Sequence, residues 1–154
     1  MKYSFLFLLT VLFTSCINND IEPQVAKDYT VENETEIIDY IEENDLNATR
    51  TSSGLYYVID EEGTGERPTT TSNVTVAYKG YFTDKVVFDQ SSEAGVSFNL
   101  NGVIKGWVEG IPLFKEGGSG ILLIPAHLGY GSFNYYGIPG GSVLIFNIKL
   151  ISVN

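Results

Sequence analysis

Short apolar runs, in which hydrophobic residues alternate with polar ones or gather as β-branched and aromatic side chains, recur from residue 54 onward. Turn-forming residues bound each run, and this combination is typical of strands in a half-buried sheet. A wide gap at residues 125–141 separates the last two runs and predicts an irregular loop. The predicted strands are 55–59, 74–82, 86–88, 96–100, 119–124 and 142–152.

Two stretches carry their apolar residues at helical spacing instead. The isoleucines of the acidic segment 33–46 fall on one side and predict a short amphipathic helix. Residues 104–114, which include the one tryptophan of the chain, place their large apolar side chains on one face of a second helix. An antiparallel sheet packed over that second helix is an α+β domain, which we expect to span residues 54–154.

The N-terminus has the pattern of an export signal, which we expect to span residues 1–15. Residues 5–13 form an apolar run that is too short for a bilayer span of about 20 residues but suits a signal-peptide core. The run ends in Phe-Thr-Ser-Cys, which resembles a bacterial lipobox and predicts that Cys16 is lipidated. Residues 16–53 are then an acidic tether that includes the first helix. The alternatives are an ordinary signal peptide with an incidental cysteine, or a buried N-terminal strand.

The formal net charge of −10 is unevenly distributed. Residues 16–62 contain thirteen acidic and two basic residues, whereas residues 66–154 contain six of each. Because no basic patch is available to contact phosphates, we do not expect nucleic-acid binding. With one cysteine and one histidine, and no G-x-S-x-G motif, we expect neither a metal or cofactor nor serine-nucleophile chemistry. The single histidine, His127, is expected to lie on a surface loop.

Two segments carry the candidate chemistry. Residues 103–107 (Val-Ile-Lys-Gly-Trp) end in the tryptophan, whose large rigid indole can form the floor of an apolar pocket. Residues 124–131 end in Tyr130, which lies between two glycines and is placed to reach over such a floor. This combination indicates a site that acts by shape and desolvation rather than through a nucleophile or a metal ion.

Residues 54–154 resemble an FKBP-type peptidyl-prolyl cis-trans isomerase domain. The resemblance rests on five segments that occur in the family's order and spacing. It implies a strongly bent antiparallel sheet half-wrapped around one short helix, in agreement with the strand order above. The matching segments are 76–80 (Val-Ala-Tyr-Lys-Gly), 87–91 (Val-Phe-Asp-Gln-Ser), 103–110, 124–131 and 143–146.

The resemblance also implies an apolar cup that binds a prolyl residue. Val96 is an alternative to Phe98 in the cup wall, because both side chains lie on the same face of their strand. For each aromatic residue the alternative role is packing in the core. The residues expected to bind substrate are Tyr78, Phe88, Phe98, Val103, Ile138 and Phe146.

Four residues are expected to act on the reacting bond by the same resemblance: Asp89, Ile104, Trp107 and Tyr130. Trp107 forms the base of the cup, while the backbone N–H of Ile104 and the hydroxyl of Tyr130 donate hydrogen bonds to substrate carbonyls. Asp89 is expected to orient or polarise the substrate rather than transfer a proton. Its alternative role is an Asx-type turn where strand 86–88 ends.

The implied function is acceleration of X-Pro bond rotation during the folding of exported proteins. The expected partners are unfolded or partly folded proline-containing polypeptides, a membrane contacted through the lipidated cysteine, and FK506-type macrolides. The expected location is the bacterial cell envelope. The alternative is a non-enzymatic chaperone or assembly module that binds proline-containing segments without significant turnover, with the N-terminal helix as its working part.

Overall fold

The computed structural model describes residues 25–154, so the expected signal peptide and Cys16 lie outside the described part of the chain. Three short 3-10 turns accompany the helices and strands, at Leu100–Gly102, Ile111–Leu113 and Ala126–Leu128. In chain order the elements are α1 (Thr30–Glu43), β1 (Thr49–Arg50), β2 (Tyr56–Glu61), β3 (Asn73–Tyr81), β4 (Val87–Gln90), β5 (Val96–Asn99), α2 (Lys105–Gly110), β6 (Ser119–Ile124) and β7 (Leu144–Val153).

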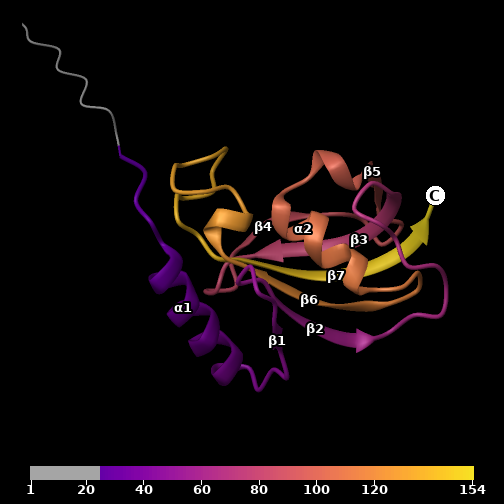
Figure 1. Ribbon diagram of the computed structural model, residues 1–154, viewed down its shortest axis with the longest axis horizontal. Helices are drawn as coiled ribbons and strands as arrows, with labels where there is room; N and C mark the ends of the chain where they lie inside the picture. Colours follow the sequence, from indigo (N-terminus) through magenta and orange to yellow (C-terminus); the bar gives the residue numbers. More distant parts are fainter. Residues whose placement is uncertain (1–24) are drawn as a thin grey trace, which may run out of the picture.

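The strands form one antiparallel sheet in the order β1-β2-β6-β7-β3-β4. β5 also pairs with β3, at residues 73–76, whereas β4 pairs with residues 79–81 of the same strand. The pairing register shifts within β2, near Thr75 in β3 and again after Gly80. Such irregularities increase local twist and bend a sheet. The sheet therefore curves around α2 (Figure 1), which confirms the predicted α+β fold with a bent sheet around one short helix.

The core on the α2 side of the sheet is built from side chains of the helix and of the central strands. Trp107 and Ile111 pack there against Leu122, Leu144 and Phe146. The α-helix stops at Gly110 and continues as a 3-10 turn, because a proline at position 112 has no N–H to bond the preceding turn. The expected helix 104–114 is thus a short α-helix followed by a different helical turn.

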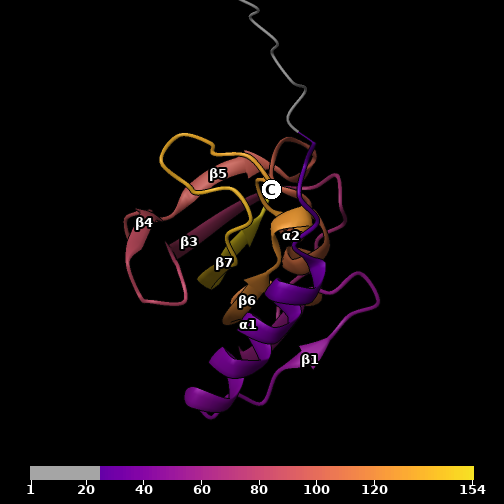
Figure 2. The same cartoon turned by 90° about the vertical axis from the view of Figure 1, so that its left-hand side faces the viewer.

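A second core lies on the other face of the sheet, under α1. Neighbouring strand residues alternate between the two faces, so Leu122 belongs to the first core and Leu123 to the second. Ile37 and Tyr40 of α1 pack against Leu123, together with Ile145. Figures 1 and 2 show α1 lying across one end of the sheet, where β6 finishes and β7 begins.

The packing of α1 changes the expected domain organisation. The prediction treats residues 16–53 as a tether and starts the domain at residue 54. In the structure Ile37 is fully buried against the sheet, so the folded unit extends back at least to α1. The helix also begins and ends three residues earlier than expected, at Thr30 and Glu43. No sequence pattern predicts β1, which is only two residues long.

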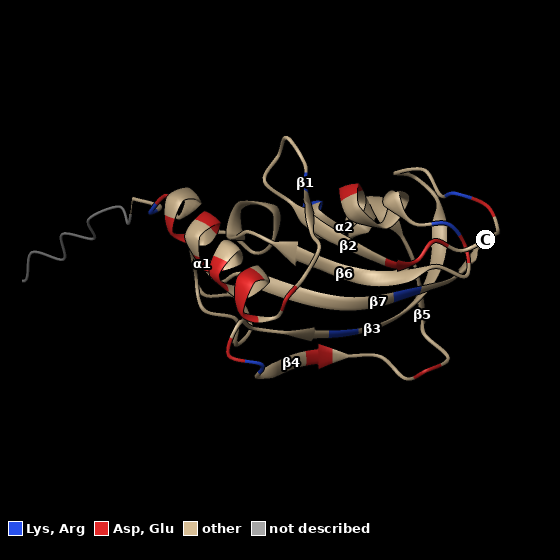
Figure 3. Ribbon diagram, turned by 90° about the horizontal axis from the view of Figure 1, so that it is seen from below, with Lys and Arg blue, Asp and Glu red and all other residues tan. Residues whose placement is uncertain are grey.

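The acidic residues of α1 are exposed or half-buried and give that end of the molecule a concentrated negative charge (Figure 3). The rest of the described chain carries mixed charges. Among residues 25–154 no helix is both long enough and apolar enough to cross a bilayer.

Candidate active site

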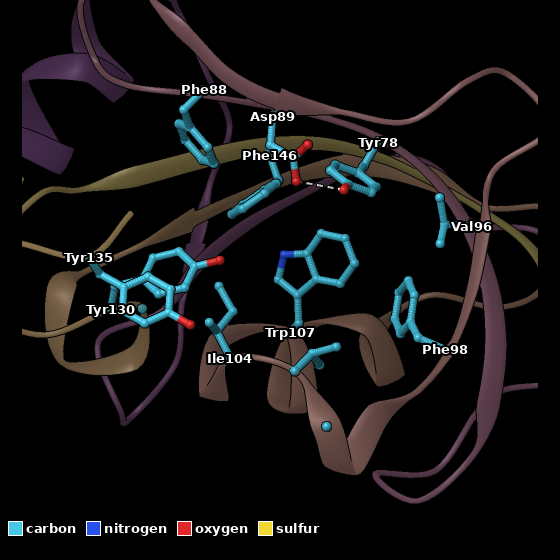
Figure 4. A pocket seen from close by; sticks show the side chains of 13 residues that line it. Tyr78, Phe88, Asp89, Val96, Phe98, Ile104, Trp107, Tyr130, Tyr135 and Phe146 are labelled. Carbon is cyan, nitrogen blue, oxygen red and sulfur yellow. Dashed lines mark hydrogen bonds between the residues drawn. The ribbon is translucent and has the colours of Figure 1, made fainter. Parts of the chain in front are cut away.

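A pocket of about 630 Å³ opens between α2, the edge of the curved sheet and the loop that joins β6 to β7 (Figure 4). Each surrounding element contributes side chains to it. The lining residues are Tyr78, Phe88, Asp89, Val96, Phe98, Gly102, Val103, Ile104, Trp107, Gly129, Tyr130, Tyr135 and Phe146.

Trp107 forms the floor of this pocket. Its ring centroid lies 5.0 Å from that of Tyr78, 5.1 Å from Phe146 and 5.2 Å from Phe98, the first two in edge-to-face contact. Such packing fixes the indole plane because aromatic faces attract aromatic edges. The indole N–H is buried and has no hydrogen-bond partner within residues 25–154. The floor is therefore rigid and mostly apolar, with one unpartnered hydrogen-bond donor.

Gly80 allows two aromatic walls to meet behind the floor. Phe88 and Phe146 pack edge to face with centroids 5.4 Å apart, and Gly80 pairs with both neighbouring strands between them. A Cβ at position 80 would lie 2.7 Å from the Phe146 ring and 2.8 Å from the Phe88 ring. Only glycine fits there without displacing a wall, which gives the Gly of segment 76–80 a physical role.

The polar side of the pocket is a hydrogen bond between a phenol and a carboxylate. The hydroxyl of Tyr78 donates to Oδ2 of Asp89 at 2.7 Å. Burial, and then this hydrogen bond, raise the pKa of Tyr78 to about 12, so the phenol keeps its proton at neutral pH. Asp89 lies in β4 rather than after it, since β4 extends to Gln90. It is therefore held by strand pairing, opposite Gly80 in β3, and not by a turn.

Two further hydrogen-bond donors lie at the pocket rim. Ile104 precedes α2 with extended backbone, and its carbonyl accepts the N–H groups of Trp107 and Val108. Its own N–H has no acceptor among the hydrogen bonds of the described residues. Tyr130 stacks on Tyr135 with centroids 4.8 Å apart, and burial raises the pKa of its hydroxyl. Both groups are free to donate to a bound chain.

All but one of the residues predicted to bind or act on substrate line this pocket. Val96 and Phe98 both line it, so the choice between them was unnecessary. Ile138 does not: it is 9 % exposed, packs in the core and borders a neighbouring groove beside Val87. Tyr135 also lines the pocket, although it is not among the residues predicted to bind substrate. His127 lies exposed on the loop with Nε2 2.9 Å from the Ser53 carbonyl oxygen.

The family model of FKBP-type peptidyl-prolyl cis-trans isomerases matches residues 64–151. The chain belongs to this family. The matched range contains every lining residue of the pocket. The FKBP-type domain here therefore includes the aromatic cup and the Tyr78–Asp89 pair, whereas α1 precedes the matched range.

Individual relatives agree with this assignment. The isomerase FkpA of Escherichia coli K12 is 37 % identical over 145 residues, which cover 92 % of this chain and 53 % of FkpA. FkpA of Buchnera aphidicola from Schizaphis graminum is 44 % identical over 108 residues, covering 68 % of this chain and 43 % of the relative. This chain thus spans about half the length of the curated relatives it matches.

The fold is also similar to those of solved isomerase structures. The crystal structure of FkpA from Escherichia coli superposes with a TM-score of 0.72 at 38 % identity, covering 81 % of this chain and 61 % of that chain. A peptidyl-prolyl cis-trans isomerase from Pseudomonas syringae gives a TM-score of 0.71 at 26 % identity, covering 84 % of this chain and 98 % of that chain.

Proposed function

We propose that this chain catalyses cis-trans isomerisation of X-Pro peptide bonds in unfolded or partly folded polypeptides. The observation that carries the proposal is the aromatic cup: a buried indole floor, enclosing aromatic walls, and further hydrogen-bonding groups at the rim. A cup of this kind fits a pyrrolidine ring on Trp107 and leaves the adjoining amide at the rim. Family membership supports the same activity.

The chemistry required is rotation about a bond with partial double-bond character. The barrier is about 18–20 kcal/mol, because the twisted amide loses its resonance. At the transition state the carbonyl also loses part of its negative charge. A dry aromatic pocket therefore disfavours the polar planar amide relative to the less polar twisted one. Because about 1.4 kcal/mol gives a tenfold change in rate, modest differential solvation has a large effect.

The rim groups hold the substrate chain while its bond rotates. The N–H of Ile104 and the hydroxyl of Tyr130 donate to substrate carbonyls, and Asp89 is kept in place by Tyr78. Such contacts convert binding energy into orientation of the rotating segment. No acid–base step is required, because rotation about the amide bond neither makes nor breaks a covalent bond.

The test is a protease-coupled or NMR exchange assay on an X-Pro peptide. Asp89→Ala and Tyr130→Phe should each lower kcat/KM by about tenfold or more, because each removes a contact to the rotating segment. The matched controls are Asp60→Ala, an exposed carboxylate in β2, and Tyr57→Phe, a tyrosine outside the pocket. Loss of activity in the controls, or none in the pocket variants, would mean that the site is misplaced.

The same assay separates the enzyme from a non-enzymatic binding module. Tight binding of a proline-containing segment without acceleration of its exchange would identify the module. An FK506-type macrolide gives a second measure, since a ligand that occupies the cup should inhibit turnover in proportion to its binding.

We propose further that the chain is exported and lipid-anchored at Cys16 in the bacterial envelope, where it acts on exported proteins. The lipobox-like sequence before Cys16 supports this proposal, and this cysteine lies outside the described residues. Globomycin, which blocks lipoprotein signal cleavage, should cause the precursor to accumulate. An unchanged mature size, or an unchanged size in Cys16→Ser, would contradict the anchor but not the isomerase.

A further inference from the structure

The loop that carries Tyr130 is closed at its base by a ring of four hydrogen bonds, and one member of the ring comes from α1. The side-chain amide of Asn33 donates from Nδ2 to the Gly141 carbonyl at 2.8 Å. The Gly141 N–H donates to the Gly131 carbonyl, and the Gly131 N–H donates to the Ala126 carbonyl. The Ala126 N–H then donates back to Oδ1 of Asn33 at 2.8 Å.

Asparagine is well matched to this position. Its side chain donates to Gly141 at one end of the loop and accepts from Ala126 at the other. These partners are 108 and 93 residues away in the chain. Asn33 is 2 % exposed and Ala126 is 3 % exposed, so water cannot replace these bonds. Without the amide, a buried N–H and a buried carbonyl would both lose their partners, which is costly in a dry environment.

Residues just before α1 also contact the loop that joins β6 to β7. Gly141 has a positive φ of 82°, and a Cβ there would collide with the ring of Tyr29. The Ser132 hydroxyl donates to the Lys27 carbonyl. A Cβ at Gly140 would likewise collide with the Ser132 backbone, so both glycines are positions of close approach. The segment that makes these contacts precedes residue 64, where the family match begins.

We propose that Asn33 is a positioning residue for Tyr130. Tyr130 is bonded directly to Gly131, which contributes both its N–H and its carbonyl to the ring. Opening the ring frees Gly131, whose φ is 81°, and lets the Tyr130 hydroxyl move away from the substrate carbonyl. A displacement of about 1 Å in a positioned group can cost up to a hundredfold in rate. The inference rests on the proposed isomerase function, in which Tyr130 contacts the substrate.

The test uses Asn33→Asp in the full chain, since this change keeps the shape but replaces the donor with a charged oxygen facing the Gly141 carbonyl. Its control is Ile37→Ala, one turn later in α1, which weakens helix packing without touching the ring. We expect Asn33→Asp to lower kcat/KM about tenfold, and Ile37→Ala to change it less than about twofold, both at a temperature where the circular dichroism spectrum is native. If Asn33→Asp does not fold, Asn33→Ser replaces it, because serine cannot span both partners.

A double-mutant cycle separates positioning from general destabilisation. In the Tyr130→Phe background, where the hydroxyl is already absent, Asn33→Asp should lower kcat/KM by less than about twofold further. An equal loss in both backgrounds would show that Asn33 does not act through Tyr130 and would overturn the proposal.

Amide hydrogen exchange tests the ring without reference to activity. The amides of Gly131 and Gly141 should exchange at least about tenfold faster in Asn33→Asp and remain near wild type in Ile37→Ala. Wild-type exchange at these amides in Asn33→Asp would overturn the proposal, as would faster exchange with unchanged kcat/KM. If the wild-type chain shows no turnover, the proposed function fails, and exchange at Gly131 still decides whether Asn33 holds the loop.

Discussion

Tyr78 joins the apolar and polar parts of the pocket in a single side chain. Its ring packs edge-on against Trp107, and its hydroxyl donates to Asp89. Burial and the neighbouring carboxylate both disfavour the phenolate, which is why the pKa of Tyr78 rises from 10.0 to about 12. The folded chain therefore holds this proton more tightly than the unfolded chain does.

This difference predicts a specific loss of stability at alkaline pH. The contribution of Tyr78 is fully present below pH 10 and is lost as the pH rises from 10 through about 12. Denaturant midpoints measured between pH 9 and 12 should therefore fall more steeply for the wild type than for Tyr78→Phe, since the other tyrosines are common to both. Parallel curves for the two proteins would contradict the assignment.

The residues of the cup could be predicted through the resemblance to the FKBP-type family, because most of the matching segments lie in regular elements. Tyr78 and Phe146 are placed by the register of β3 and β7, and Trp107 by its position in α2, whereas Phe88 lies where the pairing of β3 and β4 shifts. Ile138 could not be placed this way, since its loop has no repeating pattern. Its inward position depends on a tight turn in which Tyr135 and Ile138 exchange backbone hydrogen bonds.

At the scale of elements, β3 organises the site. It pairs with β7 on one side and with both β4 and β5 on the other, so one strand aligns residues from three others. Its Gly80 lies where two aromatic rings meet. The close approach of those rings, rather than backbone flexibility, explains the glycine.

Gly80→Ala should damage both stability and activity, because the added methyl group displaces Phe88 and Phe146. We expect the free energy of unfolding to fall by about 1–3 kcal/mol, the usual cost of overpacking, and kcat/KM to fall with it. Urea denaturation measures the first effect. Gly102→Ala is the stability control, since a Cβ there meets nothing within 4 Å. Equal stability of the two variants would count against this packing.

The helix α1 is fastened to the sheet by a small polar cluster. Nε and Nη2 of Arg50 donate to the two carboxylate oxygens of Glu34 at 2.9 and 3.2 Å, and the Tyr56 hydroxyl donates to the same carboxylate at 2.7 Å. The hydrogen bonds from Arg50, and then from Tyr56, lower the pKa of Glu34 below its ordinary value near 4.5.

The lowered pKa predicts weaker docking of α1 in acid. The contribution of ionised Glu34 is present above pH 4.5 and is lost as the pH falls through its folded-state pKa. Between pH 5 and 3, urea midpoints should fall more for the wild type than for Glu34→Gln, which keeps the shape without the charge. A constant difference in urea midpoint between the wild type and Glu34→Gln across this pH range would contradict the prediction.

The sequence predicted whether most elements are helices or strands, but not that α1 packs on the sheet. Its amphipathic pattern indicates a helix with an apolar side, yet a local pattern does not reveal which surface that side covers. The surface that α1 covers is formed by Ile145 and Leu123, which lie more than eighty residues later in the chain. For the same reason β1 and the extension of β4 through Asp89 emerge only when their partner strands are present.

At the scale of the whole molecule, the two cores share their strands. Leu122 and Leu123 are adjacent in β6 yet belong to opposite cores, as do Leu144 and Ile145 in β7. Loss of either core exposes one face of the same central strands. We therefore expect residues 25–154 to unfold as one cooperative unit.

Ile37→Ala tests this coupling, because it removes a fully buried side chain from the α1 core only. It should lower the free energy of unfolding by about 2–5 kcal/mol. The shift should be identical by far-UV circular dichroism and by fluorescence of Trp107, the one tryptophan, which lies in the other core. A helix signal that is lost before the tryptophan signal would mean that α1 unfolds independently.

The most direct test of the central claim is NMR exchange spectroscopy on an X-Pro peptide with a substoichiometric amount of the full chain. Uncatalysed exchange takes tens to hundreds of seconds. The aromatic cup predicts exchange fast enough to give cis-trans cross-peaks with the wild-type chain. It predicts much weaker cross-peaks with the Asp89→Ala, Tyr130→Phe double variant. An exchange rate with the wild-type chain equal to that of the peptide alone would contradict the isomerase.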